Sequence, residues 1–154
     1  MILAENKNGQ QLLEYIVISE EALAENKELA PITGSFAIIK CKGKYLIAYN
    51  KWRNQWEFPA GGIENGETYK QCAIRELFEE TNQKVYDMNF KGLFKIYDKN
   101  KEKIKYNAVY FQEVDEIQAF NSNDEMTQIM LWDFKTEIGE FDEVDKKIVE
   151  MSCI

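Results

Sequence analysis

The sequence predicts a layered α/β fold, with a strand-rich sheet, one central helix and one terminal helix. Short β-like segments lie on both sides of a strongly helical stretch, and a second helical stretch lies near the C-terminal end. With 154 residues, 45% of them hydrophobic, the chain has the size and apolar content of one compact domain. We therefore expect a single domain over residues 1–154.

The predicted strands are short runs rich in β-branched and aromatic residues, separated by glycine, proline or charged turns. We assign strands to residues 12–19, 35–40, 45–49, 55–58, 90–97, 104–111 and 129–132, hairpin turns to 42–44 and 99–103, a polar helical or loop stretch to 20–30, and a glycine-containing loop to 60–67. So many strands beside so few helices place a sheet at the centre of the fold.

The central helix is the clearest element. Thr68 and Gln71 have the spacing of a capping box, so the helix should begin at Thr68. It should end near Asn82, since asparagine tolerates the left-handed conformation of a helix C-terminus. Its apolar stripe should face the core through Ala73, Ile74, Leu77 and Phe78. The terminal helix is predicted over 142–151, with Val144, Ile148 and Met151 turned inward.

Composition excludes several kinds of chemistry. The chain has no histidine, which removes Ser-His-Asp and Cys-His catalysis and histidine-ligated metal sites. Acidic residues outnumber basic ones 27 to 19, and the formal charge of −8 disfavours broad binding of nucleic acid. Cys41, Cys72 and Cys153 are too scattered for a disulfide framework or a zinc site.

The beginning of the chain lacks the basic and apolar regions of a secretory signal. No apolar run approaches the length of a membrane span. We therefore expect a cytoplasmic protein that does not contact a membrane. The sequence assigns no oligomeric state.

Three glutamates of the central helix are its main chemical feature. Glu76, Glu79 and Glu80 stand at i, i+3 and i+4, which places them on one helix face. A solvated acidic face is the ordinary explanation, but like charges at i,i+4 cost roughly 0.2–0.5 kcal/mol per pair, and a helix C-terminus disfavours anions. The clustering therefore indicates a bound cation, and carboxylates without histidine suit Mg²⁺ or Mn²⁺. Gly61 and Gly62, just before the helix, permit close approach of a phosphate or metal.

These residues resemble the Nudix box, G-x5-E-x7-R-E-U-x-E-E-x-G-U, in which U is a bulky aliphatic residue. The matching positions are Gly61, Glu67, Arg75, Glu76, Leu77, Glu79 and Glu80. Two positions depart, with Asn82 in place of the last glycine and Gln83 in place of the aliphatic residue. Asparagine tolerates the left-handed conformation, and Val85 can supply the missing apolar contact.

The resemblance implies a Nudix-type α/β/α sandwich, a mixed β-sheet between helices with the box as loop-helix-loop. It implies a hydrolase that cleaves a diphosphate linkage, in which Mg²⁺ or Mn²⁺ neutralises the diphosphate and activates water. The residues that it implicates are the Ala60 carbonyl, Glu76, Glu79 and Glu80 as metal ligands, Arg75 as the group that orients the glutamates, and Glu67 as support.

A further acidic ligand or base is expected outside the box. Glu125, within residues 123–126, resembles the acidic stretch of oxidised-purine nucleoside triphosphatases in the superfamily. Glu113, at the end of another predicted strand, is the competing candidate. An ordinary charged loop is the alternative explanation of the stretch around Glu125.

The substrate class follows from the same resemblance. Small size and the stretch around Glu125 favour a nucleoside triphosphate, such as the oxidised purine 8-oxo-dGTP. Residues 58–62 resemble the loop of ADP-ribose and nucleotide-sugar pyrophosphatases, although the proline that typically follows their box is missing. A catalytically silent nucleotide sensor is a further alternative. A 5′-RNA pyrophosphohydrolase would need a basic groove, for which the lysines of 99–105 are candidates, although a solvated hairpin tip is the simpler interpretation.

No substrate-binding residue is assigned from the sequence. The possible aromatic platforms, more typical of core packing, are Trp52, Trp56, Phe94, Tyr97 and Trp132. Arg53 is a possible phosphate contact, but a loop arginine is more often solvated.

Overall fold

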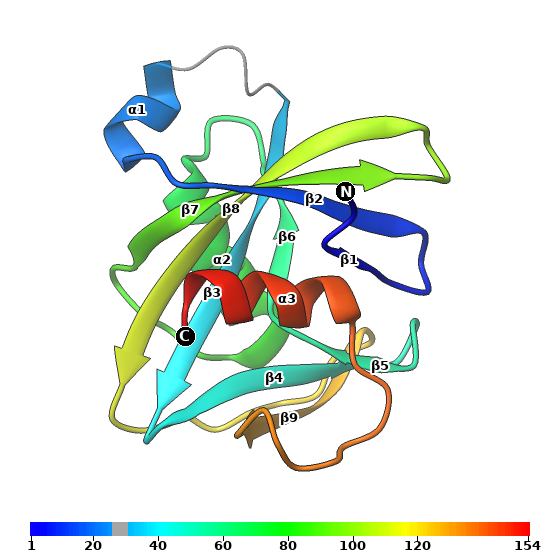
Figure 1. Cartoon of the computed structure of the whole chain (residues 1–154). Helices are drawn as coiled ribbons and strands as arrows, with labels where there is room; N and C mark the ends of the chain where they lie inside the picture. Colours follow the sequence, from blue (N-terminus) through cyan, green and yellow to red (C-terminus); the bar gives the residue numbers. More distant parts are fainter. Residues whose placement is uncertain (26–30) are drawn as a thin grey trace.

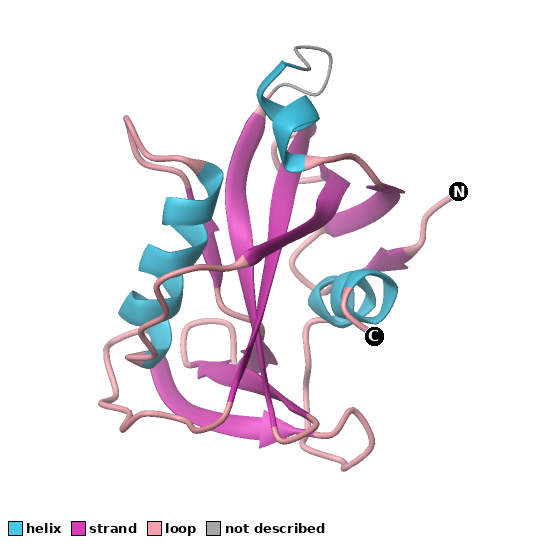
Figure 2. Cartoon of the chain, turned by 90° about the vertical axis from the view of Figure 1, so that its left-hand side faces the viewer, coloured by secondary structure: helices cyan, strands magenta, loops and turns pink. Residues whose placement is uncertain are grey.

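A computed structural model describes residues 1–25 and 31–154 (Figure 1). The main helices are α2 (Tyr69–Thr81) and α3 (Glu143–Ser152), and a short α1 spans Glu20–Glu25. Figure 2 shows α2 and α3 on opposite sides of the sheet, so the chain forms three layers. The predicted α/β sandwich with a mixed sheet is confirmed.

Nine strands form the sheet within the described residues. Along the chain they are β1 (Ala4–Glu5), β2 (Gln10–Ile16), β3 (Ile32–Cys41), β4 (Lys44–Asn50), β5 (Gln55–Glu57), β6 (Ala60–Gly62), β7 (Asn89–Asp98), β8 (Lys103–Val114) and β9 (Met126–Trp132). Across the sheet the order is β1-β2-β7-β8-β3-β4-β5, with β6 beside β3 and β9 beside β4. β3 and β8 pair in parallel, and the other described pairs are antiparallel.

Strand β3 brings the glycine segment into the middle of the sheet. β3 pairs with β8 from Ile32 to Cys41 but with β4 only near the hairpin, which leaves room for β6 beside Gly34–Phe36. A Cβ atom on Gly34 would lie 2.2 Å from the Gly61 carbonyl oxygen, so this pairing requires glycine there. The prediction of a loop over 60–67 was therefore wrong for Ala60–Gly62, which form a strand.

Element boundaries differ from the prediction mainly at the ends. β2 begins two residues earlier than predicted, since Gln10 and Gln11 pair with β7, and it ends at Ile16. The stretch predicted as helix or loop over 20–30 begins as α1, and residues 26–30 lie outside the described residues. Among the described helices, none is long and apolar enough to cross a membrane.

Each face of the sheet has its own core. On the α2 side Ala73 and Leu77 are fully buried, as predicted, but Phe78 is 47% exposed because it lies about 100° around the helix from Leu77. On the α3 side Val144 and Ile148 are buried, as predicted, while Met151 is 36% exposed. The inward face of α3 is rotated toward its buried members Asp145 and Val149, which turns Met151 outward.

Candidate active site

Helix α2 holds the box glutamates, and both of its ends are fixed as predicted. Thr68 is the N-cap: its hydroxyl accepts from the Gln71 N–H, and the Gln71 side chain accepts from the Thr68 N–H. Asn82 is the C-cap with φ of 63°, and its N–H donates to the Phe78 carbonyl. Asparagine therefore adopts the left-handed conformation that glycine commonly provides at this position.

Arg75 gathers most of the acidic residues of the box around one guanidinium. Its Nε donates to Glu67 at 2.6 Å, and its Nη1 donates to Glu76 at 2.7 Å and to Glu79 at 3.0 Å. Its Nη2 also donates to the Gly62 carbonyl at 2.8 Å. The hydrogen bond from Arg75 lowers the pKa of Glu67. Arg75 thus connects the glycine segment to the helix and offsets part of the negative charge of the carboxylates that it contacts.

The carboxylate of Glu76 lies directly against the Gly61 backbone. A Cβ atom on Gly61 would be only 2.1 Å from the Glu76 carboxyl carbon, so any side chain there would displace it. Burial raises the pKa of Glu76, although its hydrogen bond with Arg75 opposes this shift. Gly61 is therefore required for the position of Glu76.

Glu80 has a different environment from the other box glutamates. It is 7% exposed, and one oxygen accepts from the Ala60 N–H at 3.1 Å. In the described part of the chain no lysine or arginine forms an ion pair with it. Burial raises the pKa of Glu80 to about 9, and the negative charges of Glu125 and Glu76 add to this effect.

Glu125 lies in the groove next to Glu80, whereas Glu113 does not. Glu125 accepts from the Asn50 amide at 3.0 Å, and the Arg53 guanidinium is 3.9 Å away. Glu113 is an exposed residue of β8 that pairs with Lys40 and is not part of the groove lining. Of the two candidates from outside the box, the structure brings Glu125 into the candidate site.

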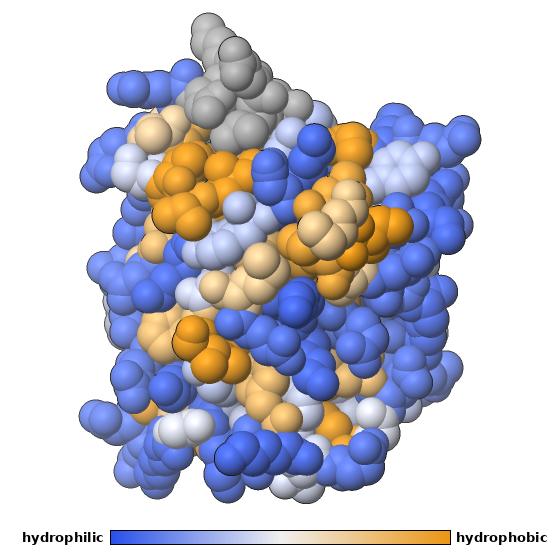
Figure 3. All heavy atoms as spheres, in the orientation of Figure 1, coloured by the Kyte–Doolittle hydropathy of each residue, from blue (hydrophilic) through white to orange (hydrophobic). Residues whose placement is uncertain are grey.

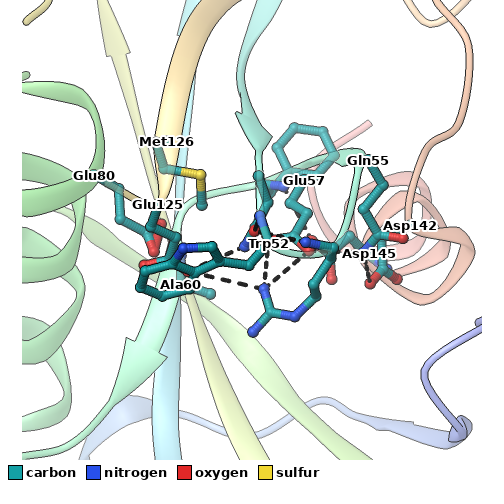
Figure 4. A network of polar contacts seen from close by, with 12 residues as sticks. Trp52, Gln55, Glu57, Ala60, Glu80, Glu125, Met126, Asp142 and Asp145 are labelled. Carbon is teal, nitrogen blue, oxygen red and sulfur yellow. Dashed lines mark hydrogen bonds and ion pairs between the residues drawn. The ribbon is translucent and has the colours of Figure 1, made fainter. Parts of the chain in front are cut away.

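The groove has a volume of about 570 Å³ and is lined at one end by β6, Glu80 and Glu125. In Figure 4, Glu80 and Glu125 lie beside Ala60. Asp142 and Asp145 lie at the opposite side of the view, and Glu57 lies between these two groups. A groove of this size accommodates a nucleotide-sized ligand.

Three further buried carboxylates line the groove, and the sequence did not identify them. Glu57, Asp142 and Asp145 are each less than 9% exposed. Glu57 accepts two hydrogen bonds from Arg53, at 2.9 and 3.0 Å, and one from the Gln55 amide. Asp145 accepts from the Phe58 N–H at 3.0 Å. Burial raises the pKa of Glu57 and that of Asp145.

The sequence held only a weak signal for these residues. Glu57 is a charged residue between two aromatic ones in a short strand, and Asp145 directly follows the inward-facing Val144. Trp56, Phe94 and Trp132 pack in the core, as favoured, but Trp52 is 66% exposed and does not.

The acidic side chains in this arrangement suit a hard divalent cation, although they are not gathered as a ready-made ligand set. Within the described residues, no three acidic or cysteine side chains converge to hold a metal ion. Glu76 and Glu79 are instead hydrogen-bonded to Arg75. Glu80 and Glu125 face one groove, and among the described residues neither accepts a hydrogen bond from a cationic side chain. Carboxylate oxygens are the donor chemistry that Mg²⁺ and Mn²⁺ prefer.

Solved structures support the same fold. A mutant of the Bacillus subtilis pyrophosphohydrolase BsRppH is 19% identical, with a TM-score of 0.72 over 100% of this chain and 99% of that one. The NUDIX domain of Shewanella oneidensis NrtR, solved with ADP ribose, is 16% identical, with a TM-score of 0.62 over 88% of this chain and 99% of that one.

Sequence comparisons identify the family. The protein named "Putative 8-oxo-dGTP diphosphatase YtkD" of Bacillus subtilis is 30% identical over 83 residues, 54% of this chain and 51% of that protein. An RNA pyrophosphohydrolase of Actinobacillus succinogenes is 47% identical over 47 residues, 30% of this chain and 24% of that protein. The chain thus spans about half or less of these curated relatives. A family model described as NUDIX domain matches residues 30–150. This chain belongs to the Nudix domain family.

Proposed function

We propose that this chain is a divalent-metal-dependent pyrophosphohydrolase that cleaves a diphosphate linkage of a nucleoside 5′-triphosphate group. The environment of Glu80 carries the proposal. Its buried carboxylate faces the groove with Glu125, accepts only a backbone N–H within the described structure, and has a pKa raised to about 9 by burial. A buried glutamate that serves a structural ion pair has a cationic side chain beside it, and Glu80 does not. A buried acid without such a partner is typical of a cation-binding site.

The proposed ligands are Glu80, Glu125 and the Ala60 carbonyl, together with Glu76 and Glu79. A divalent cation bound there would neutralise the diphosphate and supply an activated water for attack at phosphorus. Gly62 leaves its backbone open to phosphate, while the Glu76 carboxylate covers Gly61, and Arg75 fixes this backbone through the Gly62 carbonyl. The backbone of β6 is thus the proposed contact surface for the diphosphate, and the carboxylates of the proposed ligands lie beside it.

Two observations favour a triphosphate group over a diphosphate-linked sugar. Curated relatives of the chain carry the names 8-oxo-dGTP diphosphatase and RNA pyrophosphohydrolase. The sequence has two prolines, Pro31 and Pro59, and both precede the box helix, so the proline typical of ADP-ribose hydrolases does not follow the box. The ADP-ribose or nucleotide-sugar alternative is favoured by the fold shared with ADP-ribose-binding Nudix domains.

The test measures hydrolysis of nucleoside triphosphates, 8-oxo-dGTP among them, and of ADP-ribose with and without Mg²⁺ or Mn²⁺. We expect metal-dependent release of a nucleoside monophosphate from a triphosphate. We also expect Glu80→Gln to lower kcat more than about 100-fold, since even the outer partners of metal ligands contribute 10–100-fold. Release of a nucleoside monophosphate from the sugar-linked substrate alone would redirect the assignment to ADP-ribose.

A matched pair of variants separates the groove from the surface. Glu125→Gln should lower activity substantially, whereas Glu113→Gln, an exposed glutamate outside the groove, should leave it within about twofold of the wild type. Saturable nucleotide binding without turnover, at any metal concentration, would instead support a sensor.

A further inference from the structure

The groove is lined by lysines as well as by carboxylates. Lys101, Lys103 and Lys105 come from the β7–β8 hairpin and line the groove together with Asp98. In a chain of net charge −8, three cations on one wall of a groove are a marked local concentration. The proposed metal ligands of the groove, Glu80 and Glu125, lie at the end where β6 begins.

Of the three groove lysines, Lys105 is the one most enclosed by protein. It is only partly exposed, and burial lowers the pKa of its ammonium group. Among the described residues it forms no ion pair and no side-chain hydrogen bond. Two carboxylates, Asp98 and Asp145, act on its charge without an ion pair, and Asp98 is already bonded to the backbone N–H groups of Asn100 and Lys101. A partly desolvated ammonium group that faces a groove is a binding group for an anion.

The same hairpin also carries a lysine of the ordinary surface kind. Lys99 forms an ion pair with Glu5 at 2.9 Å and does not line the groove. Figure 3 shows mostly hydrophilic atoms at the upper right, where Figure 1 places the β7–β8 hairpin. Partial burial beside the groove distinguishes Lys105 from a solvated tip, and the exposed Lys103 lines the groove next to it.

Lys103 and Lys105 form a row along β8 that leads away from the β6 backbone, the proposed contact surface for the diphosphate. Lys103, Lys105 and Asn107 share one face of β8, and Asn107 lies close to the Gly34–Gly61 contact. Alternate residues of a strand are about 6.6 Å apart, so Lys105 lies roughly 7 Å and Lys103 roughly 13 Å along the strand from Asn107. A second anionic group, separated from the scissile diphosphate by a sugar, would reach this row.

We propose that Lys103 and Lys105, with Lys101 beyond them, form an anion subsite for the first internucleotide phosphate of a 5′-triphosphorylated nucleotide chain. This inference rests on the proposed function, because the metal end must hold the triphosphate for the chain to extend along the lysines. It makes the natural substrate a 5′-triphosphorylated oligonucleotide and a free nucleoside triphosphate a truncated version of it. Binding energy from the lysines then contributes to use of the longer substrate.

The test compares a nucleoside triphosphate with the 5′-triphosphorylated RNA dinucleotide that has the same first nucleotide. The variant is Lys103→Gln with Lys105→Gln, and its folding is checked by its Tm. We expect the variant to lose about tenfold more kcat/KM on the dinucleotide than on the mononucleotide, mainly through KM. The slope of log affinity against log salt for the dinucleotide should also fall by about 0.7 per lost phosphate contact.

Lys99→Gln is the matched control, because it removes a lysine of the same hairpin that does not face the groove. It should change neither activity. Equal losses on both substrates would overturn the proposal, since the lysines would then bind the triphosphate itself. No loss on either substrate would also overturn it and would make the lysines a solvated hairpin tip.

Failure of the proposed function would be recognised separately. If the wild type hydrolyses neither substrate with Mg²⁺ or Mn²⁺, the catalytic assignment fails, and binding of the fluorescently labelled triphosphorylated dinucleotide then tests the subsite alone. Weaker binding by the lysine double variant supports the subsite. Equal binding by the variant and the wild type overturns it.

Discussion

Two groups of glutamates meet at the box helix, and they differ in what neutralises them. Glu67, Glu76 and Glu79 share the guanidinium of Arg75, whereas Glu80 and Glu125 receive hydrogen bonds from the neutral Ala60 N–H and Asn50 amide. The first group shares one cationic partner within the protein and joins the glycine segment to α2. The second leaves unbalanced acid in a groove. The glutamates thus divide into a structural set held by Arg75, which includes the proposed ligands Glu76 and Glu79, and a pair whose hydrogen bonds come from neutral groups.

The comparison predicts opposite stability effects along one helix, and the largest is at Arg75. Its side chain is 22% exposed and contacts four carboxylates and the Gly62 carbonyl. Arg75→Met should lower the free energy of unfolding by about 2–4 kcal/mol, because partly buried glutamates lose their counter-charge. Urea unfolding without metal measures this.

Lys70→Met is the control on the same helix. Lys70 pairs with Asp87 at 3.0 Å, and Asp87 is 71% exposed, so its loss should cost no more than about 1 kcal/mol. If Arg75→Met were as mild as this control, the Arg75 group would not be the structural set described above.

Glu80→Gln should raise the free energy of unfolding, whereas Arg75→Met should lower it. Glutamine keeps the bond from the Ala60 N–H and carries no charge, whereas folding raises the pKa of Glu80 from 4.5 to about 9. A raised carboxyl pKa lowers stability as pH rises from 4.5 toward 9, so at pH 7 the metal-free variant should gain up to about 3 kcal/mol, at 1.36 kcal/mol per pKa unit.

Urea unfolding of wild type and Glu80→Gln in EDTA, between pH 5 and pH 8, checks this gain, which should widen with pH. Added Mg²⁺ should stabilise the wild type more than the variant, since glutamine removes one charged ligand of the ion. Exposed Glu113→Gln should match the wild type throughout. A loss of stability in metal-free Glu80→Gln would place Glu80 with the structural set.

Local signals predicted the box helix well. The Thr68–Gln71 capping box and the left-handed Asn82 depend on neighbouring residues, and both confirmed the predicted ends of α2. The conversion of Ala60–Gly62 from loop to strand depended on Gly34, which is distant in sequence, and so local reasoning missed it. Side-chain periodicity also failed at Phe78, where one helix position separates the core from solvent.

The groove was harder to predict, because it is assembled from segments that meet only in the fold. Glu57 from β5, Asp145 from α3 and Lys105 from β8 have no sequence relation to one another, and each alone has an ordinary interpretation. Glu125 was a candidate only through its resemblance to related enzymes. Its competitor Glu113 could be excluded only from the fold, because the pairing of β8 with β3 places Glu113 outside the groove.

Asp145 extends the comparison to the α3 side of the groove, with the smallest expected effect. Burial raises the pKa of this carboxyl, and Asp142 and Glu57 add to the shift. The protein therefore loses stability as pH rises above the ordinary aspartate range, and Asp145→Asn should reduce that loss. The gain should be about 1 kcal/mol at pH 7, because the substitution removes one buried negative charge from a cluster of acids.

The amide oxygen of asparagine can still accept from the Phe58 N–H, so the substitution changes charge and preserves geometry. Unfolding at pH 4 and pH 7 measures the difference, and the exposed Glu143→Gln, in the first turn of α3, should shift stability by less than about 0.5 kcal/mol. A loss of stability at both pH values would mean that Asp145 is charged and structurally paired, like the glutamates around Arg75. A gain confined to pH 7 would place it with Glu80, among the acids that the fold leaves unbalanced where a ligand binds.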